Sequence, residues 1–107
     1  MRRHVTIRPR ADQDIDEHLI FLAGESGIDT ALRFFDAVQD ACERLLKMPE
    51  MGAPREDLTS TLPLLRMWPI SAFPKYLIFY QPVHSGIDVV RVIYGTRDIP
   101  TLFEEEP

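Results

Sequence analysis

The stretch Ile87-Asp-Val-Val-Arg-Val-Ile-Tyr-Gly-Thr-Arg-Asp98 holds the longest run of β-branched residues in the chain. Such residues favour an extended backbone and pack well on a pleated surface. Because side chains alternate across a strand, one face would carry Ile87, Val89, Arg91, Ile93 and Gly95, and the other Asp88, Val90, Val92, Tyr94 and Thr96. Both faces are mostly apolar, which indicates an interior strand that is covered on both sides.

The first half of the chain predicts two helices. A short strand over residues 3–8 ends at Pro9, and apolar residues at helical spacing then predict an amphipathic helix over about residues 11–23. Asp29 is the expected N-cap of a second helix, which ends before Pro49. The apolar stripe of this second helix is Ala31, Phe34, Phe35, Val38, Cys42, Leu45 and Leu46. The short loop between the helices indicates an antiparallel αα-hairpin.

The second half predicts a sheet that covers this hairpin. Residues 50–63 contain Gly52, Pro54 and Pro63 among polar residues, as expected for a loop. Strands are expected over residues 64–70, 75–80 and 87–95, with the last two joined as a β-hairpin. This order indicates an α+β fold in which an N-terminal strand and an αα-hairpin pack on a small antiparallel β-sheet. We expect a single domain over residues 1–107.

Composition narrows the class of protein. With 45% hydrophobic and 27% charged residues, the chain falls in the soluble globular range. Its apolar runs are shorter than the ~20 residues that cross a bilayer, and no signal-peptide core follows Met1, so we expect a cytoplasmic protein without membrane contact. The single Cys42 agrees with a reducing compartment. A net charge of −5 argues against direct, sequence-specific DNA binding.

Few polar residues have the spacing of a catalytic or cofactor site. The three histidines, His4, His18 and His84, lie far apart in sequence and lack metal-ligand neighbours. The chain contains neither a glycine-rich phosphate loop nor a Gly-x-Ser-x-Gly motif. Cys42 falls in a core stripe, where a free thiol behaves as a small hydrophobe. We therefore expect no metal and no cofactor.

The arginines of the second half are more informative. Arg91 alternates with apolar residues, so it either snorkels from a half-buried face or lies in a groove on the sheet. Arg97 forms either a local ion pair with Asp98 or part of a site. A carboxylate or phosphate would fit a site that combines these two arginines with Arg66 and with Tyr80 or Tyr94, because guanidinium groups offer planar, bidentate donors.

Several short motifs, taken in order, resemble the ParE branch of the RelE/ParE toxin superfamily. They are Ala11-Asp-x-Asp-Ile15, Ala31-x-x-Phe34, Leu45-x-x-x-Pro49-x-x-Gly52 followed by Arg55, Tyr76-Leu-Ile-Phe-Tyr80, and Arg91-Val-Ile-Tyr-Gly-Thr-Arg-Asp98. The likeness covers nearly the whole chain. It implies the toxin of a bacterial type II toxin–antitoxin pair, of the kind that serves plasmid stabilisation.

The ParE resemblance implies a non-enzymatic inhibitor that binds DNA gyrase. It further implies neutralisation by a ParD-like, ribbon-helix-helix antitoxin in a hetero-oligomeric complex. The expected contact residues for antitoxin or target are Leu19, Leu22 and Phe34 on the helices, with Arg66, Arg91 and Arg97 as polar anchors.

Two alternatives stay open at this point. RelE-like relatives cleave messenger RNA on the ribosome, and in that case Arg91 and Arg97 would stabilise the reacting phosphate while Tyr94 assists proton transfer. The acidic balance and the presence of only two lysines argue against a surface that binds ribosomal RNA. The third possibility is a family member that has lost toxicity and still binds its antitoxin.

Overall fold

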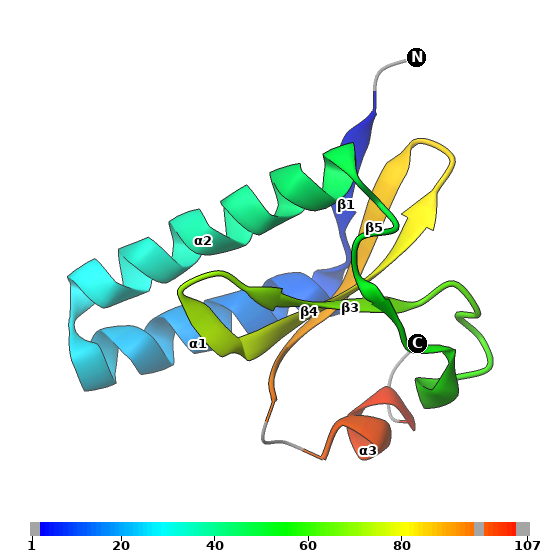
Figure 1. The fold of residues 1–107 in the computed structure, drawn as a ribbon. Coiled ribbons are helices and arrows are strands. Elements are labelled where there is room, and N and C mark those ends of the chain that lie inside the picture. The colour runs from blue at the N-terminus through cyan, green and yellow to red at the C-terminus, as the bar shows by residue number, and fades with distance from the viewer. Residues whose placement is uncertain (1–2, 96–97, 105–107) are drawn as a thin grey trace.

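The computed structural model describes residues 3–95 and 98–104, and Figure 1 shows their arrangement. In chain order the elements are β1 (His4–Ile7), α1 (Pro9–Ser26), α2 (Ile28–Lys47), β2 (Ala53–Pro54), a 3-10 helix η1 (Glu56–Leu58), β3 (Arg66–Ile70), β4 (Phe73–Val83), β5 (Gly86–Tyr94) and α3 (Ile99–Glu104). The predicted α+β class, with an N-terminal strand and an αα-hairpin packed on a sheet, is confirmed.

Helices α1 and α2 form a hairpin that turns at Gly27 (Figure 1). Pro9 occupies the first turn of α1, where a missing N–H leaves no acceptor unpaired. Gly27 has a φ of 94°, in the region that favours glycine, and this conformation separates the two helices. The buried stripe of α2 is Ala31, Phe34, Val38, Ala41, Cys42 and Leu45.

The sheet has five strands in the order β1-β5-β4-β3-β2. The pairings β3–β4 and β4–β5 are antiparallel, as expected, whereas β1 lies parallel to β5. Residues 50–63 were expected to form a loop, but they contain β2, which pairs antiparallel with β3, and the 3-10 helix η1. Tight turns fix the relative direction of strands joined in a hairpin. No such turn joins β1 to β5, and the sequence therefore did not predict that the sheet is mixed.

Both faces of β5 are buried, which confirms the prediction of an interior strand. Helices α1 and α2 cover one face, and α3 with the residues around η1 covers the other (Figure 1). A bulge alters the predicted alternation, because Tyr80 pairs with Val89 while Phe79 pairs with Arg91, which leaves Val90 as an extra residue. As a result, Val92 joins the core under the helices, and Val90 joins the core under α3.

Within residues 3–95 and 98–104, no helix is long and apolar enough to cross a membrane.

Candidate functional site

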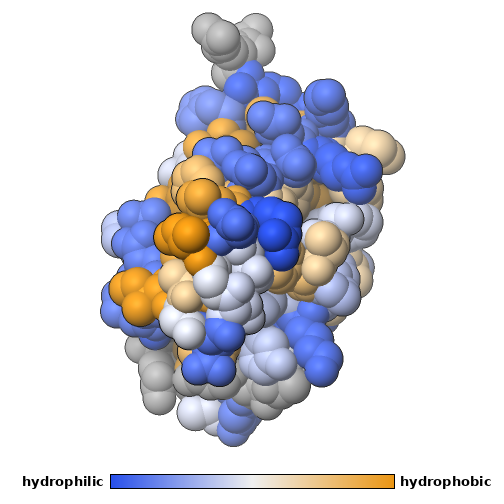
Figure 2. All heavy atoms as spheres, turned by 90° about the vertical axis from the view of Figure 1, so that its left-hand side faces the viewer, coloured by the Kyte–Doolittle hydropathy of each residue, from blue (hydrophilic) through white to orange (hydrophobic). Residues whose placement is uncertain are grey.

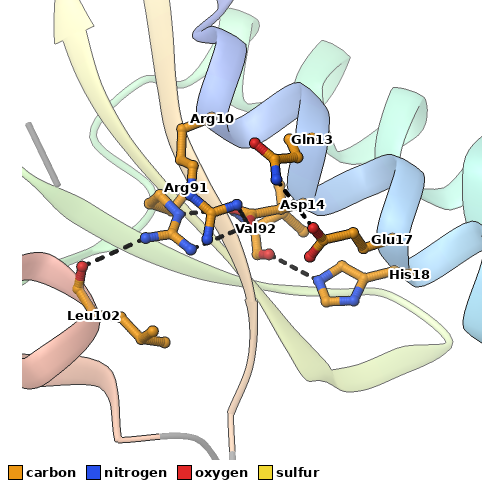
Figure 3. Close-up of polar contacts among 8 residues, drawn as sticks. All are labelled: Arg10, Gln13, Asp14, Glu17, His18, Arg91, Val92 and Leu102. Carbon is orange, nitrogen blue, oxygen red and sulfur yellow. Dashed lines mark hydrogen bonds and ion pairs between the residues drawn. The ribbon is translucent and has the colours of Figure 1, made fainter. Parts of the chain in front are cut away.

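Arg91 is buried and forms an ion pair with Asp14 of α1 (Figure 3). Its guanidinium donates from Nε to Asp14 Oδ2 at 2.8 Å and from Nη2 to Asp14 Oδ1 at 3.0 Å. The two side chains are only 4% and 6% exposed. This two-pronged geometry is the strong form of the arginine–carboxylate contact. The guanidinium of Arg91 is therefore engaged inside the protein and does not face solvent.

Asp14 also completes the edge of the sheet. Strand β1 pairs with β5 only as far as Val89, so beyond it the backbone groups of Val92 need other partners. The Val92 N–H donates to Asp14 Oδ2 at 3.0 Å, and His18 Nε2 donates to the Val92 carbonyl at 2.8 Å (Figure 3). Asp14 and His18 lie one helical turn apart. One turn of α1 thus supplies the acceptor and donor that a neighbouring strand would offer.

Two further contacts extend this network. Arg10, one turn before Asp14, donates to Asp14 Oδ1 at 3.1 Å, so one carboxylate is shared by two guanidinium groups. Arg91 also donates from Nη1 to the Leu102 carbonyl of α3 at 3.4 Å (Figure 3). Arg91 therefore joins β5, α1 and α3, which are distant in the sequence.

The sequence analysis included Asp14 only in the motif Ala11-Asp-x-Asp-Ile15 and missed this role. A usable signal was present. Asp14 follows Ala11 by three residues and directly precedes Ile15, so it falls on the buried side of the helix. A carboxylate in such a position requires a buried partner, and Arg91 is the charged residue in the middle of the interior strand.

Arg66 and Tyr80 hold the loop that follows α2. The Tyr80 hydroxyl accepts from the Gly52 N–H at 2.9 Å and donates to the Pro49 carbonyl at 2.8 Å. Arg66, which faces Tyr80 across β3 and β4, donates to the carbonyls of Glu50 and Gly52 at 2.9 and 2.6 Å. Burial raises the pKa of Tyr80, against smaller opposing effects of the Gly52 N–H and the Arg66 charge. These contacts give Arg66 a structural role.

Tyr94 belongs to an aromatic cluster on the sheet face covered by the helices. Its ring centroid lies 5.0 Å from that of Tyr76, which in turn lies 4.9 Å from His18. An open hollow of about 680 Å³ borders this cluster and is also lined by Phe21 and Phe73. Burial, and then the nearby Tyr94, raise the pKa of Tyr76.

The predicted convergence of arginines on one site is not found among the described residues. Arg66 binds the loop after α2, whereas Arg91 binds Asp14, and neither hydrogen-bonds to Tyr94. Arg97, the third arginine of that hypothesis, lies outside the described residues. Arg66 and Arg91 therefore do not together form a binding site for a carboxylate or phosphate.

The three predicted apolar contact residues lie on the inner side of the hairpin. Phe34 has no exposed surface and Leu22 is only 8% exposed, so both are corrected from contact residues to core residues. Leu19 is partly buried against the same core. Their helical spacing marks the stripe that faces the sheet, and little of that stripe is exposed to a partner.

The apolar surface that is free lies elsewhere on the hairpin. We define the hairpin patch as Ile20 of α1 with Ile28, Leu32 and Phe35 of α2, which are 75%, 64%, 55% and 41% exposed. Phe35 was expected in the core stripe, but it lies just outside it. The signal that the sequence offered was the second apolar stripe, at spacings of four and three residues, beside the buried one.

The sequence predicts neither a metal site nor a reactive thiol. Among residues 3–95 and 98–104, no three His, Cys, Asp or Glu side chains are grouped so as to hold a metal ion. Cys42 is buried, and burial, with a smaller effect of Glu43, raises the pKa of its thiol to about 11. A thiol of this kind stays protonated near neutral pH and is a weak nucleophile.

Known proteins resemble this chain in its fold and in its sequence profile. No curated protein sequence matches the chain significantly. A solved structure of the chromosomal ParDE toxin–antitoxin system from P. aeruginosa has a similar fold, with a TM-score of 0.69 at 16% sequence identity over 86% of this chain and 95% of that chain. Residues 5–99 match the sequence profile of the ParE toxin of the type II toxin–antitoxin system parDE. The chain therefore belongs to the ParE toxin family of type II toxin–antitoxin systems.

Proposed function

We propose that this ParE-family protein acts in the cytoplasm as a non-enzymatic toxin that binds and inhibits DNA gyrase. In the same proposal, a ParD-like antitoxin of the ribbon-helix-helix class neutralises it in a hetero-oligomeric complex. Membership of the ParE family supports an antitoxin partner. The choice of inhibition by binding, in place of RNA cleavage, is supported by the chemistry of the arginines and tyrosines.

The observation that carries this choice is the burial of Arg91. A nuclease of this fold would use Arg91 to stabilise charge on a reacting phosphate, which requires a guanidinium that faces the substrate. Here both prongs of the guanidinium are bound to Asp14, and the residue is 3% exposed. Releasing it would leave the buried charge of Asp14 balanced only by Arg10, whose side chain is 32% exposed. Arg91 is therefore suited to stabilising the fold.

The far face of the sheet supports the same conclusion. It is filled by a second apolar core, composed of Leu58, Leu62, Leu65, Phe79, Val90, Ile93 and Phe103. Phe103 of α3 packs edge-on against Phe79, with ring centroids 5.0 Å apart. Within residues 3–95 and 98–104, this apolar cover leaves no open polar surface on that face of the sheet for an RNA strand. The net charge of −5 adds repulsion between the protein and RNA phosphates.

Inducible expression without antitoxin tests the proposal in cells. If gyrase is the target, growth stops with broken chromosomal DNA, while translation of existing messenger RNA continues during the first minutes. The Tyr94→Phe variant should then remain as toxic as the parent, because no proton transfer is required. Rapid cleavage of messenger RNA that Tyr94→Phe abolishes would favour the endoribonuclease. Unaffected growth, with antitoxin binding retained, would favour a member without toxicity.

A further inference from the structure

An open hollow lies between α1 and the sheet, near the start of β4 and the end of β5. Its volume of about 680 Å³ falls in the range of roughly 300–1,000 Å³ that is typical of small-molecule sites. Most of its walls are aromatic rings. We define the aromatic hollow by six of its lining residues, Glu17, His18, Phe21, Phe73, Tyr76 and Tyr94. The proposed inhibition of gyrase does not involve it.

The rings of the aromatic hollow stand at steep angles to one another. The ring of Tyr76 is inclined by 78° to that of His18, with centroids 4.9 Å apart. It is inclined by 78° to Phe73 and by 64° to Tyr94, with centroids 6.4 and 5.0 Å apart. Rings packed in this way place the edge of one beside the face of the next. Because ring faces carry partial negative charge, walls of this kind form the cages that bind ammonium groups.

Phe21 is the most exposed ring of the hollow. Its side chain is 57% exposed, although it is large and apolar. It lies six residues before the turn at Gly27, and Figure 2 looks at the side of the molecule where that turn lies, with hydrophobic residues among hydrophilic ones. A ligand in the hollow would cover part of this ring and remove it from water.

The charge beside the hollow is negative. Glu17 accepts from Gln13 Nε2 at 3.1 Å, and among the described residues it forms no ion pair. Residues 11–26 contain five carboxylates and neither lysine nor arginine. Only the buried carboxylate of Asp14 in this segment is balanced, by Arg91 and by Arg10. The field of α1 at the hollow therefore favours a cation over an anion.

Lys75 also lines the hollow, and its charge would oppose a bound cation. Its neighbour Tyr76 belongs to the core under the helices, whereas Leu77 packs against the core under α3. Because side chains alternate along a strand, Lys75 projects toward the α3 side, away from the rings. His18 adds no charge while it is neutral. With Nε2 donating to the Val92 carbonyl, its Nδ1 is an acceptor for an N–H of the ligand.

We propose that the aromatic hollow binds a small organic cation, an ammonium group that carries methyl or methylene groups. The cation lies against the ring faces of Phe21 and Tyr94, with its charge beside Glu17. The choline headgroup of a lipid shares this chemistry. The net charge of −5 opposes contact with an anionic lipid surface, and we therefore assign the hollow to a cation that is free in solution.

The test compares choline with 3,3-dimethylbutan-1-ol, which has nearly the same shape and no charge. Chemical shifts of the isotope-labelled, antitoxin-free protein give the dissociation constant and the place of binding. The variants are Phe21→Leu, which removes a ring but keeps an apolar side chain, and Glu17→Gln, which removes a charge. The matched controls are Phe35→Leu and Glu25→Gln, at exposed positions that do not line the hollow. Circular dichroism checks that each variant keeps the fold.

We expect saturable binding of choline, with shifts centred on residues 17–22 and 73–76, and binding of the alcohol that is about tenfold weaker or more. Phe21→Leu and Glu17→Gln should each weaken choline binding about threefold to tenfold, because each removes one attraction for the cation, whereas the controls should bind like the parent.

Equal affinity for choline and the alcohol would overturn the cation site, as would parental affinity in both Phe21→Leu and Glu17→Gln. Absence of saturable choline binding would also overturn it. Sedimentation of the protein with phosphatidylcholine vesicles, without binding of free choline, would assign the hollow to a lipid headgroup and contradict a free ligand. None of these results depends on whether the protein inhibits gyrase.

Discussion

The replacement Asp14→Ala tests whether the buried ion pair stabilises the fold. Removing one member of a buried pair costs about 3–5 kcal/mol, because the other charge stays buried without a partner. Asp14 also accepts from the Val92 N–H, and leaving that buried donor unpaired costs roughly 1–3 kcal/mol more. The expected loss of unfolding free energy is therefore about 4 kcal/mol or more, against a total of about 5–15 kcal/mol for a domain of ordinary stability.

Denaturant unfolding, followed by circular dichroism, measures this loss. Asp16→Ala is the control, since Asp16 is exposed on the same helix and its removal should change the unfolding free energy by no more than about 0.5 kcal/mol. The double variant Asp14→Leu/Arg91→Met removes both charges and should be more stable than Asp14→Ala. A stabilising role of the ion pair would be ruled out if Asp14→Ala lost no more stability than Asp16→Ala, or if the double variant were less stable than Asp14→Ala.

Three further predictions follow from single contacts. Gly86→Ala should destabilise the fold severely, because φ at Gly86 is 146° and an added Cβ would lie 1.9 Å from a β1 carbonyl oxygen. Gly24→Ala should stabilise the fold by up to about 1 kcal/mol, because Gly24 lies within α1 and an added Cβ would meet no atom within 4 Å. Thermal unfolding measures both changes, and a lower melting temperature for Gly24→Ala than for Gly86→Ala would contradict this prediction. Burial raises the pKa of the Cys42 thiol to about 11 in the folded protein, whereas the thiol ionises near pH 9.0 in the unfolded chain. The stability that comes from keeping this thiol neutral is therefore fully present below pH 9. It is lost between pH 9 and 11, and the free energy of unfolding falls by at most about 3 kcal/mol. The stability gap between the parent and Cys42→Ala should therefore narrow over that range, and a constant gap would count against it. Tyr80→Phe should lower the unfolding free energy by roughly 1–3 kcal/mol, because it removes the two hydrogen bonds of the Tyr80 hydroxyl. Tyr94→Phe should unfold like the parent, because the Tyr94 hydroxyl forms no hydrogen bond among the described residues. Equal losses in the two variants would be inconsistent with a role of the Tyr80 hydroxyl in holding the loop after α2.

Periodicity predicted most of the elements in this fold. The helical stripes and the β-branched run around Val89 were sufficient, because each depends only on residues close in sequence. The parallel pairing of β1, the bulge at Val90 and the small helix α3 depend on contacts between distant segments, and local patterns do not encode them.

The site was harder to predict than the fold. The sequence pointed correctly to Arg91 as a polar residue that needed a partner, yet it could not show that the partner is Asp14, 77 residues away. Phe34 was selected as a contact residue because it is large and apolar, but the same property places it in the core. Whether an apolar stripe faces the sheet or the solvent depends on how the two helices are rotated, which the sequence pattern leaves open.

A gyrase assay with purified, antitoxin-free protein tests directly whether this protein inhibits gyrase by binding. Supercoiling and DNA cleavage are followed together, with Asp14→Leu/Arg91→Met as a variant that lacks the buried charges. We expect the protein to block supercoiling and to accumulate linear, gyrase-linked DNA. The double variant, once shown to be folded, should do the same. Unchanged gyrase activity, with a protein that still stops growth when expressed, would rule out gyrase as the target.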